Sequence, residues 1–311
     1  MEPIVSVVIP TYNHRDFILQ TLESVFAQTF TDYEVVVVND GSPDDTVDLL
    51  RPLAARGRIR VVEQPNRGMG AARNRGIMAA RGQYIALLDD DDLWLPDKLE
   101  HQVRVMQSRD EVILVYGRHV ILKANGTTFV DERTKLPTGS VHDEYLQRNW
   151  IVSPGQTLIR AAALRKVGGF DPGIWGNDDW ELYIRLAREG EFYFEDRPCL
   201  LYRMHGSNAS RGNAVRMANN FLKVSGKHGG WNIRLRARQL RFACPYHLPQ
   251  LRSFARKSLL NGHYREAAVA YLYIGLFGAS PVLVHLAHPR RIVTLLARKF
   301  RKPPPRGGEE A

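Results

Sequence analysis

Four short hydrophobic runs in the first 90 residues alternate with segments of helical periodicity. The runs lack a regular polar alternation, which is typical of strands buried on both faces of a sheet. They cover residues 5–10 (VSVVIP), 34–38 (EVVVV), 58–63 (RIRVVE) and 84–88 (YIALL). In the segment 17–29, Ile18, Leu22, Val25 and Phe26 fall on one helical face. Strands that alternate with helices predict a parallel sheet with right-handed crossovers, and therefore an α/β fold.

Beyond residue 90 the pattern is less regular. It predicts a helix over 99–107, a strand over 112–115, a short helix over 159–167 and a helix that begins at Asp178 or Asp179. The segment 118–150 resembles a hairpin, with Asn125-Gly126 as its turn. Asp16 is placed to cap the helix over 17–29.

Charge divides the chain into two regions. The protein has 311 residues and a net charge of +10, long enough for a large core and about two units. From Arg211 to Ala311 there are 19 Lys and Arg against 3 Asp and Glu, so the remainder carries a net charge of −6. We therefore expect a globular body over 1–210, a basic helical region over 211–302 and a disordered tail over 303–311.

The basic region carries a second hydrophobic feature. Residues 267–284 are uncharged over a length at the short limit for a membrane span, but two packed helices with a bend at Pro281 fit better. Residues 288–302 place basic side chains beside an apolar face, which suits anionic lipid headgroups. A soluble helical appendage with a solvated charged face explains the same composition equally well.

The cysteine content and the start of the chain favour a cytoplasmic protein. Cys199 and Cys244 have no metal-ligand or redox-motif spacing, and two thiols predict a reducing compartment. Glu2 and Pro3 precede an apolar run that is too short for a secretory signal. If the basic region binds lipid, the protein is expected on the inner face of the cell membrane.

Four consecutive carboxylates, from Asp89 to Asp92, follow the fourth predicted strand. Neighbouring carboxylates about 5 Å apart repel each other by roughly 3 kcal/mol at an effective dielectric constant of ~20. Such a run is stable only when it is solvated or when a cation lies among the acids. Its place at the carboxyl end of a strand favours a site for Mg²⁺ or Mn²⁺ and substrate phosphates over a solvated loop.

Polar side chains also follow the first two predicted strands. Thr11 and Tyr12 end the first strand, and Asp40 ends the second, so all three clusters converge on one crevice of a parallel sheet. This arrangement predicts a nucleotide site. The stretch Gly68-x-Gly70-x-x-Arg73 does not match the dinucleotide fingerprint, because it does not follow the first strand and has Arg73 in place of a small residue. Arg67 or Arg73 can instead reach phosphate oxygens.

A second acidic cluster, Asp178 and Asp179, opens a predicted helix. An aspartate there is a helix cap or a general base at the end of a rigid element, and the residues alone do not separate the two. His205 follows an apolar and aromatic strand, where it is a structural histidine or a further metal ligand.

Taken together, these segments resemble glycosyltransferase family 2. The motifs are SVVIPTYNH, VVVVNDGSPDDT, NRGMGAARNRGI, YIALLDDDDLWLPDKLE, GNDDWELYIRLA and YRMHGSNAS, in the family's order and spacing. The resemblance covers about residues 1–210. It implies a GT-A fold: a Rossmann-like, mostly parallel sheet flanked by helices. A nucleotide-sugar-binding half would cover 1–115 and an acceptor half 116–210, with the basic helical extension outside this domain.

The resemblance also implies roles for individual residues. Asp179 matches the catalytic base, although the family's usual Glu-Asp pair reads Asp178-Asp179 here. His205 and the DXD motif, Asp89-x-Asp91, match groups that approach Mn²⁺ or Mg²⁺. The residues expected around the nucleotide are Pro10, Thr11, Tyr12, Asp40, Arg73 and Asp90, with Asp40 reading the uracil edge.

The implied function is inverting transfer of a sugar from a nucleoside-diphosphate sugar, expected to be UDP-linked, to a hydroxyl of a glycan or lipid-linked acceptor. Such an enzyme would act in cell-surface polysaccharide or glycolipid synthesis. Two alternatives are a nucleotidyltransferase on a related α/β fold and a nucleic-acid-binding protein that uses the basic tail. The second lacks interleaved aromatics or a reader motif, so no nucleic-acid partner is expected.

Overall fold

The computed structural model describes residues 2–123, 125–130, 135–206, 214–230 and 232–278. The chain divides into two compact units, Met1–Gly212 and Asn213–Ala311. The first unit contains β1 (Val5–Thr11), α1 (Arg15–Phe26), β2 (Tyr33–Asn39), α2 (Thr46–Ala55), β3 (Arg60–Glu63), α3 (Met69–Ala79), β4 (Tyr84–Leu87), β5 (Leu93–Trp94), α4 (Lys98–Ser108), β6 (Val112–Lys123), β7 (Thr128–Val130), α5 (His142–Gln147), the 3-10 turn η1 (Pro154–Gln156), β8 (Thr157–Arg160), α6 (Ala161–Lys166), α7 (Asp178–Leu186) and β9 (Glu191–Met204). The second contains α8 (Ala214–Gly229), α9 (Ile233–Leu260) and α10 (Tyr264–Gly278).

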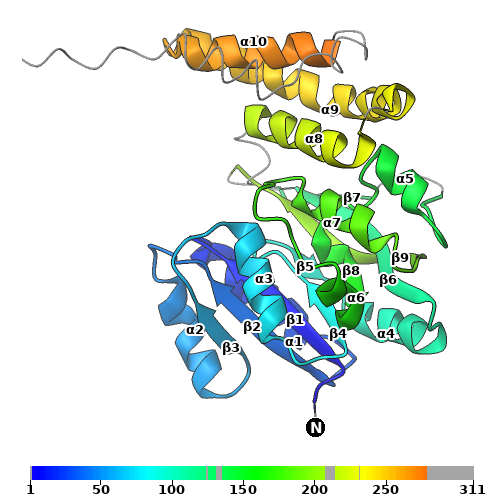
Figure 1. The fold of residues 1–311 in the computed structure, drawn as a ribbon. Helices are drawn as coiled ribbons and strands as arrows, with labels where there is room; N and C mark the ends of the chain where they lie inside the picture. The colour runs from blue at the N-terminus through cyan, green and yellow to red at the C-terminus, as the bar shows by residue number, and fades with distance from the viewer. Residues whose placement is uncertain (1, 124, 131–134, 207–213, 231, 279–311) are drawn as a thin grey trace, which may run out of the picture. The chain divides into compact units, whose positions relative to one another are not determined.

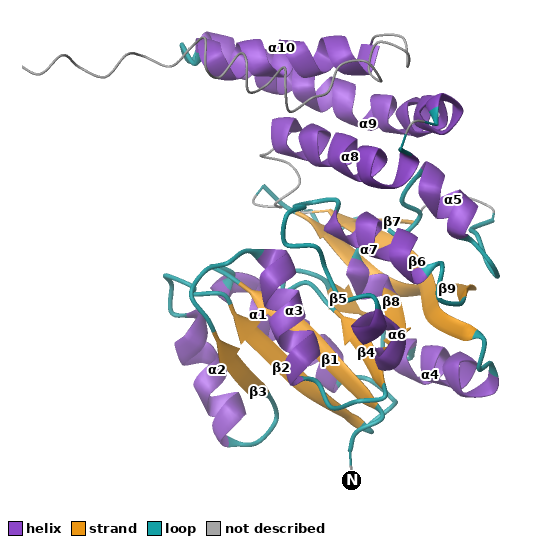
Figure 2. Cartoon of the chain, in the orientation of Figure 1, coloured by secondary structure: helices purple, strands orange, loops and turns teal. Residues whose placement is uncertain are grey.

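One sheet runs through the first unit in the order β3-β2-β1-β4-β8-β6-β9-β5, with β7 paired to β6 (Figures 1 and 2). The strands β3, β2, β1 and β4 are parallel, as the alternating pattern predicts. Beyond β4 the pairing is mixed, because β8 is antiparallel to both β4 and β6 while β9 runs parallel to β6. The predicted α/β class with flanking helices is confirmed, and its parallel part is concentrated in the first four strands.

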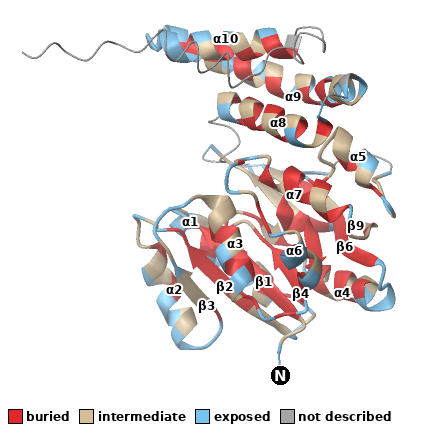
Figure 3. Cartoon of the chain, viewed as in Figure 1, coloured by how far each residue is buried: buried red, intermediate tan, exposed pale blue. Residues whose placement is uncertain are grey.

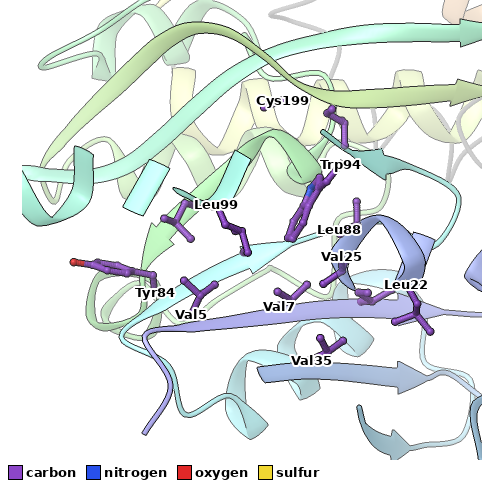
Figure 4. Close-up of a cluster of buried hydrophobic side chains, with 14 of the residues drawn as sticks. Val5, Val7, Leu22, Val25, Val35, Tyr84, Leu88, Trp94, Leu99 and Cys199 are labelled. Carbon is purple, nitrogen blue, oxygen red and sulfur yellow. The ribbon is translucent and has the colours of Figure 1, made fainter. Parts of the chain in front are cut away.

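Both faces of the parallel strands are covered, which explains their unbroken hydrophobic runs (Figure 3). Val35 and Val37 join a large cluster that includes Leu22 of α1, on one side of the sheet. Val36 and Val38 form a smaller cluster with Ala72 of α3. Figure 4 shows the larger cluster, in which side chains of α1 and Trp94 meet those of β1 and β2.

The strand order reverses between β1 and β4. The chain steps from β1 to β2 and β3 on one side and returns to place β4 on the other side of β1. Loops that leave the carboxyl ends of strands on the two sides of such a switch point separate and leave room for a ligand. The ends of β1, β2 and β4 carry the predicted polar clusters, so the topology brings them to one edge of the sheet.

Two local expectations are wrong, and a predicted strand is longer than expected. Helix α1 begins at Arg15 with His14 as its N-cap, whereas Asp16 lies in the first turn with its side chain 84% exposed. Residues Ile159 and Arg160 belong to strand β8, because pairing of Ile159 with Ile85 of β4 overrides their local helical preference. The strand predicted over 112–115 extends to Lys123, where it forms the expected hairpin with β7.

The second unit, where described, is helical, as its sequence indicates. Small residues of α9, such as Ala243 and Ala255, are buried, as are Ala270 and Tyr273 of α10. No helix in the part of the chain that the structure describes combines the length and the hydropathy needed to cross a membrane. The predicted bend at Pro281, the amphipathic segment 288–302 and the tail 303–311 lie outside the described residues.

Replacing Gly76 by alanine is expected to destabilise the protein by about 1–3 kcal/mol, because a Cβ there would overlap Val8 Cγ1 and lie 3.1 Å from Val38 Cγ2. Chemical denaturation of Gly76→Ala measures the effect. Met78→Ala on the same helix is the control, since Met78 is 71% exposed. Equal stability of the two variants would contradict a close approach of α3 to the sheet.

Candidate active site

The four carboxylates after β4 turn toward different parts of the fold. Each carboxylate contacts a polar or charged group from a different segment of the chain. These contacts offset the repulsion between neighbouring carboxylates. The pairs are Asp89 Oδ1 with Arg73 Nη2 (2.6 Å), Asp90 Oδ1 with His14 Nδ1 (2.7 Å), Asp91 Oδ2 with His205 Nε2 (2.9 Å), and Asp92 with both Ser153 Oγ (2.9 Å) and the Arg203 backbone N–H (3.0 Å).

Asp92 is an anchor for the turn. It is buried, and its carboxylate accepts hydrogen bonds from the Ser153 hydroxyl and from the Arg203 amide near the end of β9. Burial and the charge of Asp91 raise the pKa of Asp92 well above its usual value. The Thr21 hydroxyl of α1 lies 2.9 Å from the carbonyl oxygens of both Asp90 and Asp92. These contacts hold the backbone that carries the two central acids.

His14, at the start of α1, was not identified from the sequence. Its hydrogen bond to Asp90 raises its pKa to about 9 against the opposing effect of burial. His14 is therefore protonated at neutral pH, and it forms an ion pair with Asp90. The second oxygen of Asp90 is buried and has no hydrogen-bond partner among the residues that the structure describes. No local sequence signal identifies this pair, because His14 and Asp90 are 76 positions apart.

Asp91 and His205 lie together as the resemblance implies, whereas Asp89 turns to Arg73. Burial and the charges of Asp89 and Asp90 raise the pKa of Asp91, because they disfavour a further negative charge at this position. The ring of His205 also packs on Phe17, with 4.6 Å between ring centroids. Within the described ranges no three His, Cys, Asp or Glu side chains gather into a ready-made metal site.

The residues present nevertheless fit a divalent cation. Ligand atoms on adjacent corners of an octahedron with bonds of about 2.1 Å are about 3 Å apart. The Asp91 and His205 atoms are separated by 2.9 Å. The Asp91 carboxylate oxygen suits Mn²⁺ or Mg²⁺, whereas the imidazole nitrogen of His205 is a transition-metal ligand and favours Mn²⁺. Mg²⁺ commonly takes only one or two carboxylates and completes its shell with phosphates and water.

Arg73 connects the two acidic clusters. Its side chain is 3% exposed, and its Nη2 and Nη1 atoms lie 2.6 Å from Asp89 Oδ1 and 3.0 Å from Asp178 Oδ2. The charges of these carboxylates raise the pKa of Arg73 despite burial. Its guanidinium stands over the Phe170 ring, 5.2 Å from the ring centroid. Both terminal nitrogens are thus committed to protein carboxylates.

Asp179 occupies the first turn of α7 and remains partly exposed. Its Oδ2 accepts a hydrogen bond from Asn149 Nδ2 at 3.0 Å, and its Oδ1 accepts one from the Trp180 backbone N–H at 2.7 Å. Burial of the carboxylate among protein atoms and the charge of Asp178 raise its pKa to about 7. A carboxylate that exchanges its proton near neutral pH is suited to general base catalysis. Asn149 was not identified from the sequence.

The predicted nucleotide residues differ in accessibility. Pro10 and Thr11 are buried at the end of β1, whereas Tyr12 is 44% exposed. The Asp40 carboxylate accepts hydrogen bonds from Gln64 Nε2 and from the backbone N–H groups of Arg67 and Gly68, at 2.7–2.9 Å. Asp40 therefore fixes the loop between β3 and α3, a role that the sequence does not reveal.

Comparison with known proteins gives a family match and several related sequences. A family model described as glycosyl transferase family 2 matches residues 6–168. An uncharacterized glycosyltransferase of Nostoc sp. is 34% identical over 213 residues, which are 66% of this chain and 66% of that protein. The chondroitin synthase of Escherichia coli is 31% identical over 67% of this chain and 30% of its own length. The chain likewise spans only 35% of an uncharacterized glycosyltransferase of Rickettsia felis, at 28% identity over 67% of this chain.

Solved structures share the fold. The first 349 residues of S. aureus TarS, in complex with UDP-GlcNAc, align with a TM-score of 0.65 and 17% identity over 87% of this chain and 79% of that one. The mannosyltransferase PcManGT of Pyrobaculum calidifontis, in complex with GDP-Man and Mn²⁺, aligns with a TM-score of 0.57 and 20% identity, covering 96% and 85% of the two chains.

Proposed function

The chain belongs to glycosyl transferase family 2, and on that premise we propose that it transfers a sugar from a nucleoside-diphosphate sugar to a hydroxyl of a glycan or lipid-linked acceptor. The observation that carries the proposal is the link from Asp91 to Asp179. Asp91, which pairs with His205 from beyond β9, lies in the same turn as Asp89, and Arg73 joins Asp89 to the helix that begins with Asp178 and Asp179. Donor and base groups therefore belong to one connected set of side chains.

The donor side is the edge formed by β1, β2 and the loop that Asp40 fixes. Tyr12 offers an exposed aromatic ring at the end of β1, which is suited to stacking on a nucleobase. Asp40 orders the loop around Arg67 and Gly68 through three hydrogen bonds, and one of its lone pairs remains for an N–H of the base. An acceptor-only group favours a base edge with an N–H donor, such as that of uracil. A UDP-linked donor is therefore the first candidate.

Asp91 and His205 would hold the divalent cation. When bound, the cation would neutralise the negative charge that grows on the departing nucleoside diphosphate. The ion pair of His14 with Asp90 adds a cationic imidazole next to the same turn. Asp92 contributes no ligand in this scheme, since both its oxygens accept hydrogen bonds from Ser153 and Arg203.

Asp179 would act as the general base. It takes the proton of the acceptor hydroxyl, whose oxygen then attacks the anomeric carbon on the face opposite the leaving diphosphate, so a single displacement inverts the configuration. Asn149 fixes one oxygen of Asp179 by hydrogen bonding. Because Asp179 must be ionised to accept the proton, its pKa of about 7 places the active form at neutral and alkaline pH.

The donor and the cation are tested together by calorimetry. We expect the wild type to bind UDP in the presence of Mn²⁺ more tightly than GDP, CDP or dTDP. Asp91→Asn should weaken the Mn²⁺-dependent binding by at least about tenfold, because it removes an anionic ligand. Asp16→Asn makes the same chemical change at an exposed aspartate and should bind normally. Preference for another nucleotide would overturn the UDP assignment, and normal binding by Asp91→Asn would overturn the cation site.

The base is tested by turnover, measured as UDP release from UDP-sugars in the presence of acceptors. Wild-type kcat/KM should rise with pH and reach half of its maximum near pH 7, where Asp179 becomes ionised. Asp179→Asn should reduce kcat by about 10²- to 10⁴-fold and still bind the donor. Asp143→Asn, at an exposed aspartate, is the matched control. Near-normal turnover by Asp179→Asn would show that another group takes the proton.

The helical unit is proposed to bind anionic lipid headgroups, where a lipid-linked acceptor would reside. Residues 214–278 contain eleven Lys and Arg and a single acidic residue, Glu266. At 3.6 residues per turn, one side of α9 carries both exposed arginines and exposed apolar side chains. They are Arg238, Arg241, Phe242, Tyr246, Arg252, Arg256 and Leu260.

Sedimentation with phosphatidylserine-containing vesicles tests the lipid proposal on the full chain. Replacing Arg241, Arg252 and Arg256 by glutamine should weaken binding about 100-fold, since each basic residue near an anionic surface contributes about 1 kcal/mol. A control with Arg51, Arg75 and Arg104 replaced by glutamine loses the same charge from exposed positions of the first unit. Equal losses of vesicle binding in the two variants would show that net charge, and not the α9 surface, causes the binding. If neither the wild type nor the control binds the vesicles, the lipid proposal is wrong.

A further inference from the structure

We propose that Arg73 and Asp178 are positioning residues that hold the catalytic base, Asp179, in a fixed place relative to the cation-binding turn. The inference rests on the function proposed above for Asp179 and Asp91. It assigns a role to Asp178, the first acid of the pair. It also assigns Arg73 to the scaffold that joins the acidic turn to the start of α7.

The connection consists of one guanidinium and two carboxylates from three elements. Arg73 of α3 reaches Asp89, after β4, with one terminal nitrogen and Asp178, at the start of α7, with the other. The Arg73 side chain is 3% and that of Asp178 is 7% exposed. A planar guanidinium presents its donors in a fixed fork, so the two carboxylates bound to it have a defined separation. Asp89 and Asp178 are therefore held at a set distance although they are 89 positions apart in the sequence.

Other contacts place α3 against the segment that leads into α7. Asn74 Nδ2 donates to the Phe170 carbonyl oxygen, and Asn74 Oδ1 accepts from the Phe170 backbone N–H, both at 2.8 Å. A Cβ on Gly70 would lie 3.5 Å from Asp178 Oδ2, so α3 approaches that carboxylate closely. One face of α3 therefore packs against the start of α7 and the segment before it. This face contains Gly70, Arg73 and Asn74.

Burial separates this role from a role in donor binding. If the guanidinium moved away from Asp178 toward a diphosphate, the Asp178 carboxylate, which is 7% exposed, would remain buried without a charged partner, which is strongly unfavourable. Removal of the charge of Asp178 should therefore affect Asp179 and the chemical step more than the affinity for the donor.

The same arrangement sets the basicity of Asp179. The titratable groups that face Asp179 are Asp178 and Tyr183 on its own helix, Arg73 on α3 and Tyr145 on α5. Both tyrosines have a pKa raised well above the usual value by burial, so they are neutral at pH 7. Asp178 and Arg73 are thus the two charged groups among these neighbours, and Asp178 favours the protonated form of Asp179. Loss of its charge should make Asp179 a weaker base.

Two readouts on the full chain test the proposal. In Asp178→Asn, Mn²⁺-dependent UDP binding should stay within about twofold of the wild type, while kcat for UDP release falls at least tenfold. The second readout needs no activity: the carboxyl ¹³C signal of Asp179 should titrate at a pH about one unit lower than in the wild type. Asp178→Glu keeps the charge and should restore most of the turnover and the titration midpoint.

Opposite results have distinct meanings. Binding of UDP weakened more than tenfold with kcat unchanged would assign Arg73 and Asp178 to the donor site and overturn the inference. An unchanged Asp179 titration in Asp178→Asn would also overturn it. If Asp178→Asn does not fold, Arg73→Lys, which keeps one positive charge but loses the fork, should show the same loss of kcat with intact binding. If the wild-type protein turns over no donor, the proposed function is wrong. The titration of Asp179 would still test whether Asp178 and Arg73 position that carboxylate.

Discussion

The site depends on the separation of four adjacent negative charges. A backbone turn cannot move consecutive carboxylates far apart, so each must be compensated from a different direction. Arg73 approaches from α3, His14 from the start of α1, His205 from beyond β9, and Ser153 from the turn before β8. The convergence of these segments fixes much of the first unit around one short turn. Burial and the neighbouring charges of Asp89 and Asp90 still raise the pKa of Asp91.

The parallel part of the fold could be predicted from the sequence because its physical cause is local. Strands covered on both faces need no polar alternation, and the runs around Val36 and Ile85 show this directly. The acids after β4 could also be assigned to a site, because like charges at that density demand a partner. The resemblance to a family favoured Asp179 as the base, an assignment that the residues alone did not distinguish from a helix cap.

The partners of these acids could not be predicted, because they are far away in the sequence. His14 is 76 residues from Asp90, and Asn149 is 30 residues from Asp179. Nothing in the local pattern around a histidine or an asparagine indicates such a contact. Strand β8 was missed for a similar reason, since its pairing with β4 and β6 outweighs a helical composition. Asp40 was assigned to the nucleotide, and its three hydrogen bonds to the β3–α3 loop emerge only in three dimensions.

The hydrogen bond from the Arg203 backbone N–H to Asp92 restricts substitutions at position 203 very little. A main-chain N–H is supplied by every amino acid except proline, so this attachment of the turn to β9 places no demand on the side chain at position 203. Substitutions there can accumulate without loosening the acidic turn, provided that the residue is not proline. Arg73 cannot be substituted in the same way, because no other side chain can bind both Asp89 and Asp178 with two nitrogens of one planar group. Residues around this site that bond through the main chain should therefore tolerate substitution better than residues that bond through the side chain. This difference should matter more than the distance of a residue from the reacting groups.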